Sequence, residues 1–460
     1  MGEIKLGSLF DGSGGFPLAA CLCGMTPVWA SEIEPYPIAV TRSRFPKMKH
    51  LGNISTINGA EIEPVDVITF GSPCQDLSVA GKRAGLKHEA NGDTETTRSG
   101  LFMEAIRIIT EMREATNGVY PRFAIWENVP GAFSSNKGRD FRIVLEEFIK
   151  IVEPEAVMPD VPQGGWARAD CYRGDGWSLA YRTLDAQYWG VPQRRRRIYL
   201  VADFTGQSAG KILFEREGLR GYFTQSSAEG QGVAGSSETH IGEAGGYCLN
   251  DQGGDRMEVS EGVAATLRAE AHGHQPCVLS AVPLENLTLP SAGWFSRGGN
   301  VQTLTSRMGT GGNNVPLLMQ IRSGCEDGGK GPLIQENKSA TLSCANNQTL
   351  FEPIQQEPKY TVRKLTPTEC ARLQGFPDRW GDIDAKSNLT GEEYRFWLGV
   401  RNTHASINGK TVKTYTRAQM LAWYSKLHTD SAEYKMWGNG IALPTALYVM
   451  YGIGNCLNSK

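Results

Sequence analysis

The chain has 460 residues, of which 21% are charged, and its formal net charge of −2 at pH 7 gives no global sign of a polyanionic partner. Because single cores stop growing at roughly 250–300 residues, this length predicts two or three domains. No apolar run approaches the roughly 18–20 residues that cross a bilayer, and the start lacks the apolar stretch of a signal peptide, which predicts a cytoplasmic protein without a membrane partner. Ten cysteines at irregular spacing predict reduced thiols, with neither a disulfide framework nor a metal site.

From Ile4 to about Asp203, short apolar runs alternate with longer helix-like stretches, a pattern that predicts a parallel sheet with crossover helices. Buried strands are expected at 65–70, 123–126 and 198–201, and helices at 99–115 and 140–152. This first region is therefore expected to form an α/β domain.

A glycine-rich loop, Phe10-Asp11-Gly12-Ser13-Gly14-Gly15, follows the first apolar run. Its glycines allow a tight turn and close approach to a ligand before a helix that begins near Pro17. The spacing differs from the Gly-x-Gly-x-x-Gly of dinucleotide binders, but Glu32 follows the strand-like run 27–30 and could accept hydrogen bonds from ribose hydroxyls. The alternative for Glu32 is an exposed loop acid.

Two chemically capable residues follow the next two strands. Cys74 lies in Ser72-Pro73-Cys74-Gln75, just after the strand 65–70, and Glu127 follows the strand 123–126. Ligands bind outside the carboxyl ends of strands in open α/β sheets, so both side chains are expected at one cleft. Burial beside Trp126 would raise the pKa of Glu127 and let it donate a proton. The alternatives are an inert loop thiol and a solvated strand-end acid.

A run of four arginines, Arg194 to Arg197, leads into the strand 198–201. Alternate residues of a strand share a face, so Arg195 and Arg197 can act together while Arg194 and Arg196 point the other way. The run is either a solvated edge or a phosphate grip.

The middle of the chain has a different texture. Residues 206–355 hold 24 of the 54 glycines, and 10 Lys and Arg against 15 Asp and Glu. The triplets Ala265-Thr266-Leu267, Gln302-Thr303-Leu304 and Ala340-Thr341-Leu342 recur at steps of 37 and 38 residues, which favours stacked hairpin-like units over chance matches. From Lys359 onward helical and strand signals return, so we interpret the middle region as an insertion.

Taken together, six blocks resemble the DNA (cytosine-5) methyltransferases of bacterial or phage type. They are Phe-x-Gly-x-Gly-Gly at 10–15, Pro-Cys-Gln at 73–75, Glu-Asn-Val at 127–129, Gln-x-Arg-x-Arg at 193–197, the stretch 363–377 containing Arg-Leu-Gln-Gly-Phe-Pro, and Gly438-Asn439. The resemblance implies a Rossmann-like S-adenosylmethionine-dependent domain at 1–205, a smaller β/turn-rich target-recognition region at 206–358, and a segment at 359–460 that completes both.

The resemblance also implies a mechanism. The thiolate of Cys74 attacks C6 of cytosine, Glu127 holds the N3 edge and delivers a proton, and C5 then accepts the methyl group. Arg195 would contact the ring carbonyl or a neighbouring phosphate, and Arg197 would position Glu127 and Cys74. The target base must leave the duplex because C5 and C6 lie within the stack.

The cofactor site is assigned by the same resemblance. Phe10, Gly12, Gly14 and Gly15 would surround S-adenosylmethionine and Glu32 would bind its ribose. Its adenine would be lined by Ile33, Asn53 and Ile54, while Pro73 and Asn439 complete the site. This chain departs from the family at Asn53, where many members have an acid, and at Gly440, where Ser or Ala is common.

Other functions stay open at this point. A nicotinamide or flavin oxidoreductase would explain the glycine loop and Glu32, a silent binding protein would retain the cleft alone, and an RNA methyltransferase would share the chemistry. The expected partner is double-stranded DNA, with a cognate restriction endonuclease as a further candidate and a monomer as the expected state. Three repeats would also allow more than one recognised sequence.

The polar stretch with Lys82, Arg83 and Lys87 suits a loop that closes over a flipped base.

Overall fold

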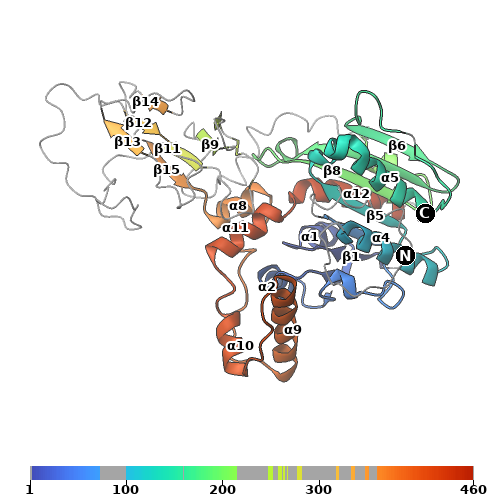
Figure 1. Cartoon of the computed structure of the whole chain (residues 1–460), viewed down its shortest axis with the longest axis horizontal. Helices are drawn as coiled ribbons and strands as arrows, with labels where there is room; N and C mark the ends of the chain where they lie inside the picture. Colours follow the sequence, from blue (N-terminus) through green and yellow to red (C-terminus); the bar gives the residue numbers. More distant parts are fainter. Residues whose placement is uncertain are drawn as a thin grey trace, which may run out of the picture.

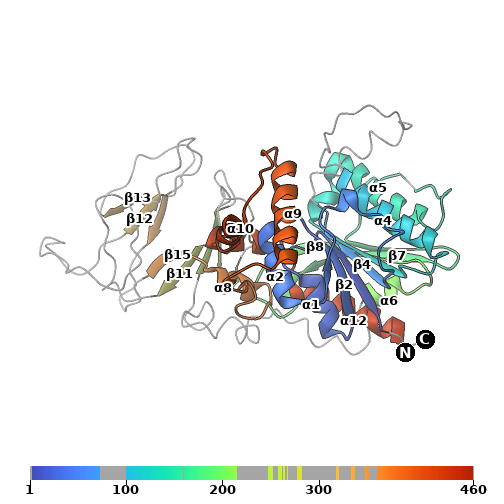
Figure 2. The ribbon, with the colours of Figure 1, turned by 90° about the horizontal axis from the view of Figure 1, so that it is seen from below.

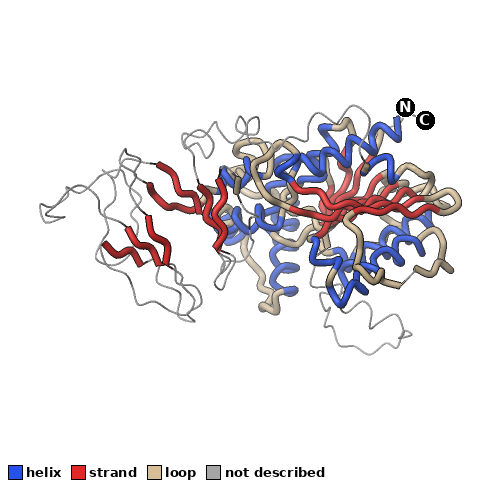
Figure 3. The backbone as a smooth tube through the Cα atoms, turned by 90° about the horizontal axis from the view of Figure 1, so that it is seen from above, coloured by secondary structure: helices blue, strands red, loops and turns tan. Residues whose placement is uncertain are grey.

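The computed structural model describes residues 3–72, 100–158, 160–214 and 360–458, together with 247–251, 257–261, 263–264, 267, 277–281, 317–320, 333–336 and 348–351. The main body is an eight-stranded sheet with helices on both faces (Figures 1 and 3). Its strand order is β3-β2-β1-β4-β5-β8-β7-β6. The strands are β1 (Lys5–Leu9), β2 (Thr26–Ser31), β3 (Lys49–His50), β4 (Val67–Phe70), β5 (Phe123–Asn128), β6 (Ala169–Arg173), β7 (Ser178–Asp185) and β8 (Arg196–Asp203).

The expected strands and helices of this region are present, but the expectation of an all-parallel sheet is wrong. The five strands β3-β2-β1-β4-β5, in sheet order, are parallel. In contrast, β8 pairs antiparallel with both β5 and β7, and β7 pairs antiparallel with β6. The physical reason is the length of the connections. Parallel strands need a crossover of a dozen or more residues, and only residues 174–177 and 186–195 separate β6, β7 and β8.

Side chains alternate between the two faces of the sheet and form a core on each. Along β5, Phe123 and Ile125 pack with one cluster, and Ala124 and Trp126 pack with the other. This period of two is expected of a strand that is buried on both faces. The first cluster is covered by α1 (Gly15–Leu22), α6 (Ala209–Leu213) and α12 (Leu443–Asn458), and the second by α4 (Leu101–Ala115) and α5 (Arg139–Lys150) (Figure 2).

The last helix thus packs against the first, α12 on α1, although they lie at opposite ends of the chain. Single turns of 3-10 helix complete the connections at η1 (Ile54–Thr56), η4 (Pro130–Phe133), η5 (Ser135–Gly138) and η6 (Ala186–Tyr188). No single described helix is long and apolar enough to cross a membrane, and only the bent pair α11 (Asp430–Asn439) and α12, inclined by 45°, passes on length and composition.

The described strands of the middle region form two antiparallel sheets beside the main body (Figure 1). Their orders are β10-β9-β11-β15 and β13-β12-β14. The strands are β9 (Tyr247–Asp251), β10 (Met257–Glu261), β11 (Cys277–Ala281), β12 (Leu317–Gln320), β13 (Leu333–Glu336), β14 (Gln348–Phe351) and β15 (Tyr360–Lys364). The three repeated triplets lie outside the described residues apart from Leu267, so the repeat stays a prediction.

Beyond this region the chain is helical. Helix α8 (Pro367–Leu373) is followed by a pair, α9 (Gly391–Ile407) and α10 (Arg417–Tyr424), before α11 and α12. Both helices of the pair begin with a reciprocal capping box, at Thr390 with Glu393 and at Thr416 with Gln419. The pair packs on α2 (Pro35–Arg44) through a separate cluster that contains Trp397 and Ile38.

Candidate active site

The carboxyl ends of four neighbouring parallel strands lie in register. Leu9 pairs with Ser31 on one side and with Phe70 on the other, and Phe70 pairs with Trp126. Glu32 directly follows β2, and Glu127 directly follows Trp126 within β5, where it pairs with Tyr199. Both residues therefore lie at the same edge of the sheet. This confirms the expected convergence of strand ends.

The glycine loop is fixed by Glu32. One carboxylate oxygen accepts the amide of Gly12 at 2.8 Å, and the other accepts the amides of Ile33 at 2.7 Å and Glu34 at 2.9 Å. Burial raises the pKa of Glu32, and these amide bonds oppose that rise. Phe10, Gly12 and Gly14 all have positive φ, at 54°, 56° and 76°, so the tight turn depends on left-handed backbone.

The far end of the chain packs directly on this loop. A Cβ on Gly15 would lie 2.6 Å from Cγ1 of Ile441 and 3.2 Å from Cζ of Phe376. The indole Nε1 of Trp380 donates to the carbonyl of Ser13 at 2.8 Å. Glycine at this position is therefore explained by close approach of the C-terminal segment.

The residues expected around adenine lie beside the same edge. Asn53 caps η1, where its Oδ1 accepts the amide of Ser55 at 3.2 Å, and Ile54 is buried. Ile33 is half-buried beside Glu32. The side chain of Asn53 thus has a local structural role that an acid there would share, because Asp also caps helices well.

The turn after β4 is held by two side chains from β5. Ser72 Oγ accepts from the indole Nε1 of Trp126 at 3.0 Å, and the carbonyl of Ser72 accepts from Nδ2 of Asn128 at 2.9 Å. Pro73 and Cys74 lie outside the described residues, as do Lys82, Arg83 and Lys87. What the structure does describe is a fixed start to the segment that leads to Cys74.

Glu127 is buried beside that turn and pairs with Arg197. Nε of Arg197 lies 3.1 Å from Oε1 of Glu127, in an ion pair whose geometry does not make a hydrogen bond. A Cβ on Gly71 would lie 3.1 Å from Oε2 of Glu127, so the acid contacts the turn itself. Burial raises the pKa of Glu127 against the lowering effect of Arg197 and Arg195. A carboxyl group in this state can retain a proton that it later donates.

The four arginines alternate as expected, with Arg195 and Arg197 inward and Arg194 and Arg196 exposed. Arg195 is 2% exposed and its Nη2 donates to the carbonyl of Gly438 at 3.1 Å and to that of Gly440. Its Nε and Nη1 have no partner among the described residues. Burial lowers the pKa of Arg195 to about 9, and neighbouring Arg197 adds to this.

Asn439 ends α11 and is exposed between the two glycines that Arg195 contacts. A Cβ on Gly440 would lie 3.0 Å from Oγ of Ser13 and 3.1 Å from Oε1 of Gln374. The departure from Ser or Ala at this position therefore has a physical reason, because the turn at 438–440 lies against the glycine loop.

Asp11 is a buried acid that the sequence interpretation missed. Its Oδ1 accepts from Oγ of Ser8 at 2.6 Å, and its Oδ2 has no partner among the described residues. Burial raises the pKa of Asp11 to about 7, the bond from Ser8 opposes this, and the charge of Glu32 adds to it. Trp380 was also missed, and so were the contacts of Trp126 and Asn128 with Ser72, because these partners lie on distant segments that no local pattern links to them.

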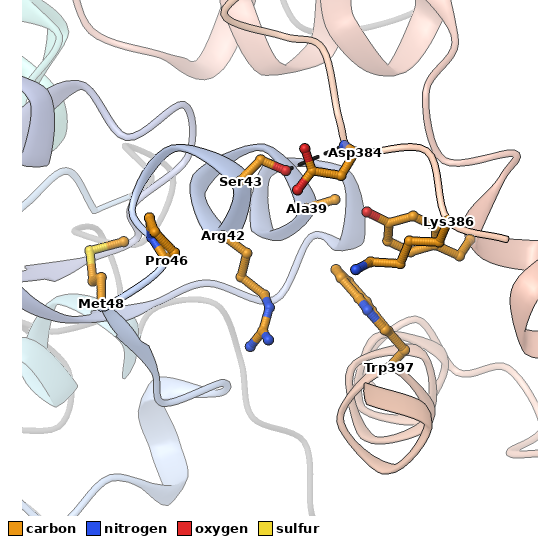
Figure 4. Close-up of a pocket in the computed structure, with 9 residues that line it drawn as sticks. Ala39, Arg42, Ser43, Pro46, Met48, Asp384, Lys386 and Trp397 are labelled. Atoms are coloured by element: carbon orange, nitrogen blue, oxygen red, sulfur yellow. Dashed lines mark hydrogen bonds between the residues drawn. The ribbon is translucent and has the colours of Figure 1, made fainter. Parts of the chain in front are cut away.

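A pocket lies away from this edge, between α2 and the α9–α10 pair. It is lined by Arg42, Asp384, Lys386 and Trp397, among others, and holds none of the predicted site residues (Figure 4). In the part of the chain that the structure describes, no group of three or more His, Cys, Asp or Glu could hold a metal ion.

Comparison with known proteins identifies a family. The model of the family described as C-5 cytosine-specific DNA methylase matches residues 4–152 and 283–395. The DNA N-6-adenine-methyltransferase of Escherichia phage P1 is 28% identical over 492 residues, which cover 98% of this chain and 61% of that protein. The type II methyltransferase M.Bsp6I of a Bacillus species is 23% identical over 385 residues, covering 82% of this chain and 88% of the relative.

Other relatives match in part. The chain spans 42% of the type II methyltransferase M2.BsuMI of Bacillus subtilis, with 30% identity over 199 residues and 43% of this chain. Among solved structures, the Dnmt2 methyltransferase of S. pombe has a TM-score of 0.47 and 15% identity, with 99% of both chains covered.

Proposed function

The chain belongs to the C-5 cytosine-specific DNA methylase family, and we propose that it transfers a methyl group from S-adenosylmethionine to C5 of cytosine in a specific double-stranded DNA sequence. The observation that carries this proposal is the buried pair of Glu127 and Arg197 against the turn that leads to Cys74. An acid of raised pKa and an adjacent nucleophile are the two groups that addition to a cytosine ring requires.

In the proposed reaction, the thiolate of Cys74 forms a bond to C6 of an unstacked cytosine while Glu127 gives its proton to N3. This keeps negative charge off the ring and makes C5 nucleophilic. C5 then accepts the methyl group, its proton passes to a general base, and Cys74 departs as thiolate as the C5–C6 double bond re-forms. N3 finally returns its proton to Glu127. Arg197 orients Glu127, and the two free donors of Arg195 are suited to the ring carbonyl.

The residues present fit S-adenosylmethionine, which supplies the methyl group when bound. A Cβ on Gly12 would meet only the carbonyl of Phe10 at 3.9 Å, so the backbone there leaves room for close approach, while Gly14 and Gly15 let the loop pack against the protein behind it. Glu32 uses three acceptor positions on backbone amides, which leaves its remaining lone pair for a ribose hydroxyl. The unpartnered Oδ2 of Asp11 adds an acceptor at the same loop. Phe10, Ile33, Asn53, Ile54, Pro73 and Asn439 complete the proposed site.

We further propose the division of the chain into a catalytic segment at 1–205, a target-recognition region at 206–358 and a final segment at 359–460 that returns to the main body. A DNA substrate locates the reaction in the cytoplasm of a bacterial cell or a phage-infected host. A cognate endonuclease remains the candidate partner, and a monomer the proposed state.

The name of the phage P1 relative raises adenine N6 as a second candidate. An exocyclic amine already carries the attacking lone pair and needs no thiol adduct, so that reaction would leave Cys74 and the proton of Glu127 unused. The experiment is incubation with tritiated S-adenosylmethionine and unmethylated plasmid DNA, with base-resolution mapping of the label. We expect label on C5 of cytosine in a fixed motif. Loss in Cys74→Ala, but not in a Cys171→Ala control, would identify the nucleophile. Label on adenine, or on RNA alone, contradicts the proposal.

A further inference from the structure

The α9–α10 pair with its connection, called here the helical hairpin (residues 391–424), is a positively charged surface that the proposed reaction does not use. Residues 391–424 contain five Lys and Arg against two Asp and Glu, both of the acids in the first turn of α9, in a chain whose net charge is −2. In contrast, residues 206–355 have a net charge of −5, from 10 basic and 15 acidic residues. A DNA-binding protein needs cations to neutralise phosphates, and the recognition region does not supply an excess of them.

The hairpin is anchored so that its tip lies near the active-site edge. In its first half, the ring of Phe396 lies 3.9 Å below the guanidinium of Arg42, near the end of α2. In its last turn, Nε2 of His404 lies 3.6 Å from Oε2 of Glu34, which caps the start of α2. These two contacts occur in opposite order along the two helices, so α9 runs antiparallel to α2. Figures 1 and 2 show the two helices beside each other. Because α2 starts at the carboxyl end of β2, the loop after α9 is at the same edge as Glu32.

Glu34 joins this anchor to the cofactor loop. Its amide is held by Glu32, and its carboxylate contacts both His404 and Nζ of Lys435, the latter at 2.9 Å. The neighbouring His404 and the bond from Lys435 lower the pKa of Glu34 to about 2, so the carboxylate is charged at neutral pH. The hairpin is thus tied to the segment that shapes the proposed site.

The tip of the hairpin, residues 408–417, presents its cations from a fixed backbone. Tyr394 Oη donates to the carbonyl of Tyr415 at 2.6 Å, and Arg401 donates to Oη of Tyr415 at 2.9 Å while its guanidinium lies 3.8 Å over the ring. Lys410, Lys413 and Arg417 are exposed, and none of them forms an ion pair within the described part of the chain. Exposed cations that form no ion pair among the described residues are suited to phosphate oxygens.

We propose that the tip of the helical hairpin binds the phosphate backbone of duplex DNA beside the target cytosine. This inference rests on the proposed function, because it requires DNA at the carboxyl edge of the sheet. The contact adds affinity and orientation without reading sequence, since phosphates are the same at every base pair. It compensates for the acidic recognition region.

The test is the triple variant Lys410→Gln/Lys413→Gln/Arg417→Gln. Its matched control is Lys47→Gln/Lys49→Gln/Arg173→Gln, which removes three exposed cations from the two edge strands and a loop of the sheet. Binding to a duplex that contains the target is measured from roughly 50 to 200 mM salt, because affinity that depends on phosphate contacts falls steeply over this range. We expect the salt slope of the hairpin variant to fall by about 1 for each phosphate that it no longer neutralises, and KM for DNA to rise with kcat unchanged.

The hairpin proposal is overturned if the parent and the hairpin variant have equal salt slopes and equal KM values, or if the control variant loses as much affinity as the hairpin variant. In either case, methylation by the parent still supports the proposed function. A parent that neither binds nor methylates duplex DNA instead overturns the proposed function. A duplex RNA arm is included, and a loss confined to RNA also overturns the assignment to DNA. Thermal unfolding of all three proteins checks that the substitutions leave the fold intact.

Discussion

The docking of the C-terminal segment on the glycine loop can be tested at Gly15. The backbone there does not have positive φ, so alanine is accepted locally, but its methyl group would lie 2.6 Å from Cγ1 and 3.0 Å from Cδ1 of Ile441. Overpacking of this kind costs about 1–3 kcal/mol. We therefore expect Gly15→Ala to lower the free energy of unfolding by about 2 kcal/mol, and to weaken the binding of S-adenosylmethionine.

A double-mutant cycle gives this prediction its specificity. Ile441→Ala removes both contacting atoms and by itself leaves a cavity, at a cost of about 2–4 kcal/mol. When the two changes are combined, the new methyl group occupies part of that cavity. The combined loss should therefore be smaller than the sum of the single losses by about 1–2 kcal/mol.

The assay is urea unfolding followed by fluorescence, with cofactor affinity measured by calorimetry. Gly164→Ala is the control, because a Cβ there would meet no atom within 4 Å, and we expect a change of less than about 0.5 kcal/mol. If the two losses are additive within about 0.5 kcal/mol, Gly15 and Ile441 are not in contact and the docking of the C-terminal segment is refuted.

Three further predictions follow from single side chains. Glu127→Gln should lower the rate of methyl transfer by a factor of about 10²–10⁴. Because the pKa of Glu127 is raised in the folded protein, the parent loses stability as pH rises through that pKa. The variant should therefore melt no lower than the parent at alkaline pH, and a clearly lower melting temperature there would contradict this. Burial and nearby Arg42 lower the pKa of His50 from 6.5 to about 4. The parent should therefore lose up to about 3 kcal/mol of stability as pH falls between these two values, at about 1.4 kcal/mol per pH unit. Urea titrations at each pH should show that His50→Gln removes this dependence. Gly399→Ala, inside α9 with no atom within 4 Å of the added methyl, should stabilise the protein by up to about 1 kcal/mol, and an unchanged or lower melting temperature would show that the helix is constrained in some other way.

The parts of the site that sequence predicted are those encoded by local pattern. The expected strands at 65–70 and 123–126 are present, although β5 continues to Asn128. Glu127 lies at the expected edge because Phe70, the last residue of β4, pairs with Trp126. The antiparallel half of the sheet was missed, since apolar runs do not reveal strand direction. Contacts such as Trp380 to Ser13, or Arg195 to Gly438, join segments hundreds of residues apart. No periodicity records them. The return of the chain to the main body was indicated by the helical and strand signals from Lys359 onward and by the order of the family-like blocks, but neither identifies the residues in contact.

Arg195 and Arg197, which flank the first residue of β8, also explain how a long middle region is compatible with a fixed position for Glu127. Arg197 contacts Glu127, while Arg195, two residues earlier, bonds to the carbonyls of Gly438 and Gly440. Arg195, the residue before β8, is therefore joined directly to the turn at the end of α11, beside the proposed active site, and the whole intervening region leaves and returns at this contact. Length and charge can change within that intervening region without displacing Glu127, because its position depends on bonds at the two ends of the region. The acidic composition of residues 206–355 is tolerable on the same grounds, provided that cations elsewhere hold the DNA backbone.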